Sequence, residues 1–142
     1  MLDRQDIILL IASGSRSEFP LDPIRVMKGC FIVSQLGRPL WREQFDFRPY
    51  DYGPFDASVY RARDALLAEG LLVADQDGRY PSYSLTERGR ERVGVLRSEQ
   101  GEESVEWLNR VGAYVTSRSF SNLLSEVYAR FPEFATASVM RR

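Results

Sequence analysis

The sequence predicts an α+β fold in which helices surround one small hairpin of strands. Three observations support this: a helical pattern that starts near Asp56 and stops at Gly70, an alternating hairpin pattern over residues 71–85, and a helix start at Thr86. Helix, strand, turn, strand, helix is the order of a winged helix-turn-helix with a two-stranded wing. Two further amphipathic patterns predict an added C-terminal helical pair.

The length and composition of the chain fit one globular unit with an appendage. It has 142 residues and an ordinary share of apolar and aromatic side chains. We therefore expect a winged-helix domain over residues 1–98. Residues 99–142 are expected to form a helical extension that packs on this domain or lies at a dimer interface.

Two largely buried helices are expected before residue 38. The unbroken apolar run over residues 7–12 predicts a first helix over residues 3–13, although periodicity alone leaves a short buried strand open. Asp22 and Pro23 are typical of an N-cap and a first helical position, so a second helix starts there. It ends at Gly37, and its apolar residues cover two adjoining faces.

Residues 40–55 are aromatic and irregular, because Pro49 and the Gly53-Pro54 pair interrupt any regular element. We interpret them as a packed connector that anchors the next helix. Lys28 is the one lysine beside eighteen arginines. It is expected to lock the connector by pairing with Asp51 or by pointing at the rings of Tyr50 and Tyr52. The alternative is an exposed lysine on an otherwise apolar helix.

The third helix and the hairpin follow from their caps and periodicity. Asp56 is the expected N-cap, and the inward stripe is Val59, Ala62, Leu66 and Gly70. Asp77-Gly78 predicts a two-residue hairpin turn. Tyr83 and Leu85 are expected on the buried face of the second strand, and Thr86 caps a fourth helix that runs to about residue 98.

The last two helices carry more apolar surface than a solvent-facing tail needs. The fifth has Val105, Leu108, Val111 and Val115 at helical spacing, and Pro132 ends the sixth. These helices must fold back on the domain or meet a partner. The alternative to packing within the chain is a homodimer through these helices, since winged helices that read DNA often act as dimers.

Several segments resemble a known family, the YwgA-like and Panacea (SocA-like) winged-helix proteins of bacteria and phages. The lysine helix over residues 26–33 and the aromatic segment over residues 47–55, which ends in Tyr-Gly-Pro-Phe, carry most of the resemblance. The wing-to-helix segment 83–89 and the segment 127–134 also match, in order, over most of the chain.

The resemblance implies a winged-helix scaffold without catalysis. Panacea-type members are associated with neutralising a toxin or with delivering a toxin to a protease. Members often place acidic residues on the third helix, which disfavours DNA there. This chain departs from that pattern because it has Arg61 and Arg63.

The residue inventory excludes several kinds of chemistry. The chain has no histidine, so histidine-based triads and most zinc sites are excluded. Cys30 lies in an apolar helix and is expected to be a packing residue. We expect no cofactor and no enzymatic activity.

The longest apolar run is too short to span a bilayer and no secretory signal opens the chain, so a cytoplasmic protein is expected.

The expected function is sequence-specific binding of double-stranded DNA by a small regulator. Ser58 and Arg61 lie on the outward face of the third helix and would read bases, while Arg79 on the wing and Arg48 before the helix would hold the backbone. The net charge of −1 gives this hypothesis little support. Those arginines would otherwise be solvated or paired with Asp64 and Asp77. The second hypothesis is a protein-binding adaptor or antitoxin that uses the same helix or the C-terminal pair.

Overall fold

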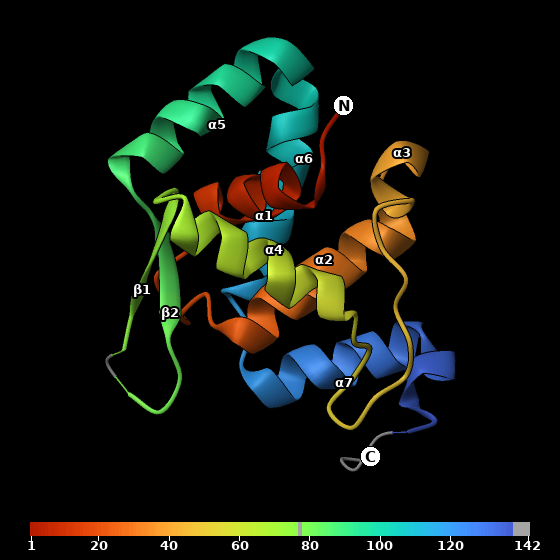
Figure 1. The fold of residues 1–142 in the computed structure, drawn as a ribbon. Helices are drawn as coiled ribbons and strands as arrows, with labels where there is room; N and C mark the ends of the chain where they lie inside the picture. The colour runs from red at the N-terminus through yellow and green to blue at the C-terminus, as the bar shows by residue number, and fades with distance from the viewer. Residues whose placement is uncertain (77, 138–142) are drawn as a thin grey trace.

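The computed structural model describes residues 1–76 and 78–137. It is a mixed α+β structure, mostly helical, with a two-stranded antiparallel sheet (Figure 1), which confirms the predicted fold class at this level. The elements are α1 (Arg4–Ser13), α2 (Pro23–Leu36), α3 (Pro39–Arg42), α4 (Ala57–Ala68), β1 (Leu72–Asp75), β2 (Ser82–Leu85), α5 (Glu87–Gln100), α6 (Glu102–Val115), α7 (Phe120–Arg130) and the 3₁₀ helix η1 (Pro132–Ala135).

Helix α1 is the central element, and helices from both ends of the chain pack around it. The carboxylate of Asp3 accepts a hydrogen bond from the Asp6 amide at 2.9 Å, and the Asp6 carboxylate accepts one in return from the Asp3 amide. This capping box starts the helix. All residues from Asp6 to Ala12 are buried. The apolar run is therefore a helix enclosed on most sides, and the strand alternative is excluded.

Helix α6 crosses α1 at very close range. An alanine Cβ built on Gly112 would lie 1.9 Å from the Ile11 carbonyl oxygen, and one on Gly14 would lie 2.0 Å from the Asn109 carbonyl oxygen. The Asn109 amide Nδ2 donates to the Leu10 carbonyl at 2.8 Å. The apolar face of α6 is buried in the same core as α1, α4 and β2. The fifth predicted helix thus folds back on the chain, and the main core runs across the boundary expected at residue 98.

Arg25 ties the start of α2 to the end of α6. Its guanidinium is buried, donates to the carbonyls of Val115 at 3.0 Å and Arg118 at 2.9 Å, and pairs with Asp22 at 2.7 Å. Cationic groups are favoured at the carbonyl end of a helix, so this side chain also complements the dipole of α6. Asp22 caps α2 and Gly37 ends it, as expected.

The connector between α2 and α4 has more order than its sequence predicted. It contains the short helix α3, and Arg48 and Phe55 exchange two backbone hydrogen bonds of 3.0 and 2.9 Å that close the loop between them. Phe47 packs edge-on against Phe31 of α2 at 5.3 Å. The prediction of a packed connector is confirmed, but residues 40–55 are not irregular throughout.

The hairpin keeps its predicted faces but not its predicted turn. Leu72 pairs with Leu85 and Asp75 pairs with Ser82, so the ladder ends at that pair and does not continue to a two-residue turn at positions 77 and 78. Residue 77 itself lies outside the described residues. Tyr83 is buried and Leu85 half-buried, as the alternation indicated.

A single glycine joins α5 to α6. Gly101 separates α5 from α6 with φ +90°, a conformation that favours glycine. Beyond α6, helix α7 buries Leu124, Val127 and Tyr128 in a second cluster around Phe31.

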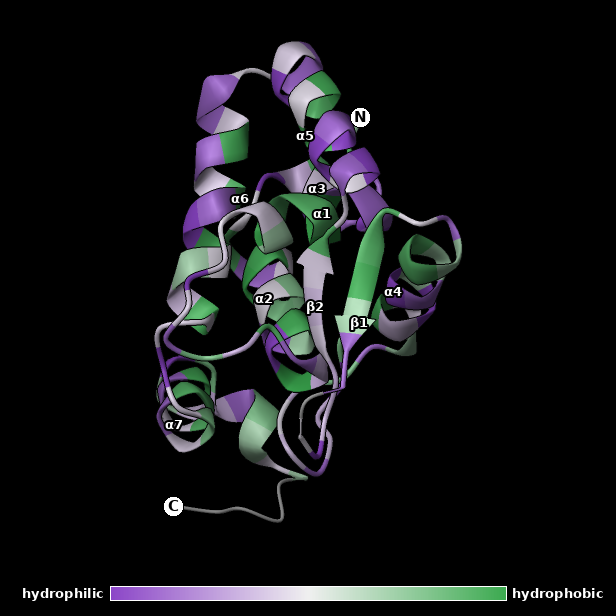
Figure 2. Ribbon diagram, turned by 90° about the vertical axis from the view of Figure 1, so that its left-hand side faces the viewer, coloured by the Kyte–Doolittle hydropathy of each residue, from purple (hydrophilic) through white to green (hydrophobic). Residues whose placement is uncertain are grey.

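Figure 2 shows α5 as largely hydrophilic, in contrast to the hydrophobic α1 and α2 inside the molecule. No helix in the described part of the chain is long and apolar enough to cross a membrane.

Candidate functional site

Helix α4 lies between the connector and the hairpin, which flank it on opposite sides (Figure 1). Its N-cap, Asp56, accepts hydrogen bonds from the amides of Ser58 at 2.9 Å and Asp46 at 2.7 Å, so one carboxylate fixes both the helix start and the connector. Val59, Ala62 and Leu66 are buried, as the stripe predicted, while Gly70 is only half-buried. We call the outward side of α4, with residues 46–52 and the hairpin, the α4 surface.

The Arg63 side chain holds α4 against β2. Its Nε donates to Asp64 at 2.9 Å and its terminal nitrogen donates to the Tyr83 hydroxyl at 3.2 Å, while the guanidinium carbon lies 4.4 Å from the Tyr60 ring centre. Burial raises the pKa of both Tyr60 and Tyr83 against the opposing charge of Arg63. Their hydroxyls therefore stay protonated at neutral pH, and Arg63 acts in packing.

The structure brings two of the predicted DNA contacts, Ser58 and Arg61, to one small polar hollow of about 290 Å³ beside the start of α1. Arg61 is exposed. The Ser58 hydroxyl is buried, and no described residue forms a hydrogen bond with it. Arg4 lines the same hollow, and its Nε atom is likewise buried and forms no hydrogen bond with a described residue. Arg61 is thus available to a partner, whereas the Ser58 hydroxyl faces inward.

The other two predicted contacts lie on the flanking elements. Arg48 pairs with Asp46 at 3.1 Å, and both side chains are mostly exposed, so this ion pair contributes little to stability. Arg79 lies in the loop between β1 and β2, with its guanidinium 5.9 Å from the Tyr80 ring centre. Asp64 pairs with Arg63 rather than with Arg61. The expected role of Asp77 falls outside the described residues.

The α4 surface also carries large side chains whose exposure the sequence did not reveal. Tyr50 and Tyr52 on the connector and Val73 and Tyr80 on the hairpin are 49–59% exposed. The aromatic richness of residues 40–55 was visible in the sequence. Which rings face solvent depends on the Arg48–Phe55 bridge, which the sequence did not predict.

The charges on the α4 surface are mixed. Its exposed charged side chains, among the residues that the structure describes, are Arg48, Arg61, Arg79, Asp46, Asp51, Asp64 and Asp75. Carboxylates thus outnumber guanidinium groups here. Duplex DNA presents a dense row of phosphates that rewards an excess of positive charge. This surface does not have that excess.

Lys28 locks the connector through the backbone. Its side chain is 2% exposed, and Nζ donates to the Tyr52 carbonyl at 2.8 Å, whereas the sequence interpretation named Asp51 and the tyrosine rings as its partners. Burial lowers the pKa of Lys28 to about 8, against a smaller opposing effect of the Asp22 carboxylate. Gly53 lets the connector approach this closely, because a Cβ there would lie 2.6 Å from Nζ.

The thiol and the carboxylates of the described residues do not form a catalytic or metal-binding arrangement. Cys30 is buried, and burial raises the pKa of its thiol, so it stays protonated. No group of three His, Cys, Asp or Glu side chains within residues 1–76 and 78–137 is placed to hold a metal ion.

These features define the class of protein: a mixed α+β, mostly helical chain whose candidate site is an exposed surface beside a small hairpin. Comparison of the chain with protein-family models, curated proteins and solved structures found no match. Membership of the YwgA-like and Panacea family stays a prediction from the residues quoted above.

Proposed function

We propose that this chain is a non-catalytic winged-helix protein that binds another protein through its α4 surface. In this proposal α4 is the third helix of the winged helix, and the β1–β2 hairpin is the wing. The buried, protonated Cys30 and the absence of histidine from the sequence support a binding role over a catalytic one.

The observation that carries the proposal is the group of half-exposed large side chains around α4. Tyrosine and arginine are enriched at the energetic centres of protein interfaces. Tyr50 and Tyr52 lie on one side of α4 and Tyr80 on the other, with Arg61 exposed on the helix between them. The mixed charges suit a protein partner better than a phosphate backbone.

DNA binding is the second candidate, and the exposure of Arg61 and Arg79 favours it. An exposed arginine on the outward face of α4 would have the reach to contact a guanine edge, and Arg79 would contact a phosphate. In this case the chain would be a DNA-binding regulator. The homodimer expected through the C-terminal helices stays a prediction, which light scattering over a range of protein concentrations would check.

Site-specific photocrosslinking tests the protein-binding proposal. A benzophenone amino acid replaces Tyr80, and in native cells we expect one discrete crosslinked protein. Arg61→Glu should reduce that product more than tenfold, because a reversed charge at an interface centre costs at least about 2 kcal/mol. The matched control carries the crosslinker at Glu91, an exposed position on α5. Equal products from both positions, or none from position 80 in a folded protein, would contradict the proposal.

Selection from random duplex DNA at about 0.15 M salt tests the second candidate. Enrichment of a motif that Arg61→Ala loses and Arg90→Ala keeps would establish DNA reading through α4 and would replace the protein-binding proposal. Arg90 is a suitable control because it is an exposed arginine on α5, which is not part of the α4 surface. Failure to enrich any motif removes the DNA candidate.

A further inference from the structure

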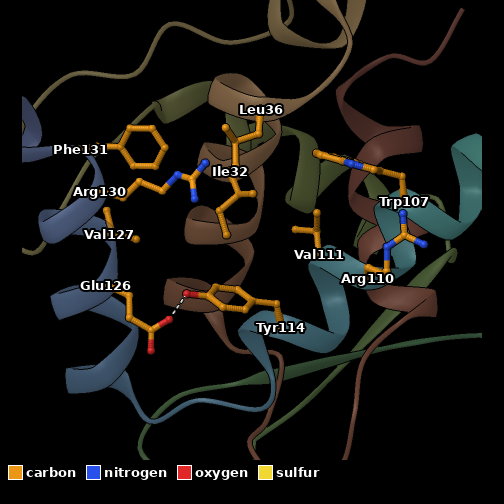
Figure 3. A pocket seen from close by; sticks show the side chains of 10 residues that line it. All are labelled: Ile32, Leu36, Trp107, Arg110, Val111, Tyr114, Glu126, Val127, Arg130 and Phe131. Carbon is orange, nitrogen blue, oxygen red and sulfur yellow. Dashed lines mark hydrogen bonds between the residues drawn. The ribbon is translucent and has the colours of Figure 1, made fainter.

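We propose that the hollow between α2, α6 and α7 binds a small amphiphilic carboxylate, an apolar chain or ring that carries one carboxylate group. This hollow is separate from the α4 surface, and the proposal goes beyond the function proposed above. It measures about 270 Å³, which is near the lower end for small-ligand sites. Figure 3 shows the side chains that line it.

Two sets of contacts hold α7 to its neighbours beside the hollow. The Phe31 cluster fixes one side of α7 to α2. At one end of the hollow, Glu126 of α7 accepts a hydrogen bond from the Tyr114 hydroxyl of α6 (Figure 3). Burial and this bond raise the pKa of Tyr114 to about 12, so the hydroxyl remains a donor at neutral pH.

The walls of the hollow are apolar and come from all three helices. Each helix contributes side chains spaced four residues apart, which place them on one face. The apolar wall residues are Ile32, Leu36, Trp107, Val111, Val127 and Phe131. Leu36 remains 45% exposed at the rim. Such a surface gains free energy by covering itself with an apolar ligand body.

The charges around the hollow select an anion. Glu126 is matched by Arg118, whose Nε donates to it at 3.2 Å. Arg110 and Arg130 both line the hollow and both are exposed. In the described part of the chain neither forms an ion pair within 4 Å. Arg130 extends toward Ile32 at one end of the hollow, whereas Arg110 lies beside Trp107 at the other end (Figure 3). A guanidinium group without a carboxylate partner beside an apolar wall, as at Arg130, matches a ligand with one carboxylate head and an apolar body.

Direct titration with decanoate, below its micelle concentration, tests the proposal. Binding is followed by tryptophan fluorescence, since Trp107 lines the hollow and lies 5.7 Å from Trp41, and by saturation-transfer NMR of the ligand. We expect saturable binding that is about tenfold or more weaker for decanol and for the decyltrimethylammonium cation, because hydrogen bonds to a charged group are worth about 1.5–3 kcal/mol.

Two variants with matched controls locate the site. Arg130→Gln should weaken decanoate binding by about ten- to hundredfold, while Arg90→Gln on α5 should leave it unchanged. Leu36→Glu places a carboxylate at the rim and should weaken binding by a similar factor. Leu40→Glu is its control, because Leu40 is similarly exposed but lies on α3, away from the hollow.

Equal affinity for decanol and decanoate, equal loss in variants and controls, or no saturable binding to the folded protein would overturn the proposal. Binding of a peptide with an apolar C-terminal residue, without binding of decanoate, would also overturn it in favour of a protein ligand. Leu36→Glu leaves the α4 surface intact, so failure here and failure of the proposed function are distinguishable by the crosslink from position 80.

Discussion

Replacing Gly112 by alanine is expected to lower the free energy of unfolding by at least about 3 kcal/mol, or to prevent folding. The new Cβ would lie 1.9 Å from the Ile11 carbonyl oxygen and 3.0 Å from its carbonyl carbon. Both atoms belong to the backbone of α1, so no side-chain rotation can relieve the overlap. The helices would have to move apart along the contact that closes the core.

Chemical denaturation monitored by circular dichroism measures this effect, and Gly94→Ala is the control. Gly94 lies in the interior of α5, and a Cβ there meets no atom within 4 Å. Alanine has the higher helix propensity, so the control should gain about 0.5–1 kcal/mol. Gains of similar size in both variants would show that the α1–α6 crossing is wider than described.

Lys28→Ala is expected to lower the free energy of unfolding at pH 7 by about 2–4 kcal/mol. The change removes the buried stem of the side chain and leaves the Tyr52 carbonyl without its donor. Lys28→Met keeps most of the stem and should recover part of the loss. A melting curve for Lys28→Ala that matches the wild type would contradict the lock.

The pH dependence of the same site has a defined sign. The Lys28 pKa is about 8 in the folded protein and 10.5 in the reference state, so the unfolded chain binds more protons between these values. Folding stability therefore rises with pH through this window, by up to about 3 kcal/mol for this group. From pH 7.5 to 10 the free energy of unfolding of the wild type should therefore rise relative to that of Lys28→Met. A constant difference would show that the amine is not the group with the lowered pKa.

The helix starts were predictable because their determinants are local. Asp22, Asp56 and Thr86 each accept the capping hydrogen bond that their positions indicated. The buried stripe of α4 and the buried face of β2 also followed from periodicity. In these cases the residues that determine the element lie within it or directly beside it in the sequence.

The rest depends on contacts between distant segments. The Ser58 hydroxyl is buried beside the start of α1, which is distant in the sequence and lines the same hollow. Arg63 of α4 donates to the Tyr83 hydroxyl on β2, a partner twenty residues away that only the fold brings close. The hollow beside α7 arises where three helices meet, and no single segment indicates it.

The pairing of α1 with α6 also affects how the chain is made. These helices are almost a hundred residues apart, and Asn109 reaches back to Leu10 across that interval. At ribosomal rates of about 5–20 residues per second, α1 waits roughly 5–20 s for the helix that covers it. The face of α1 that α6 covers stays uncovered for that interval, so the core is completed only after α6 has emerged.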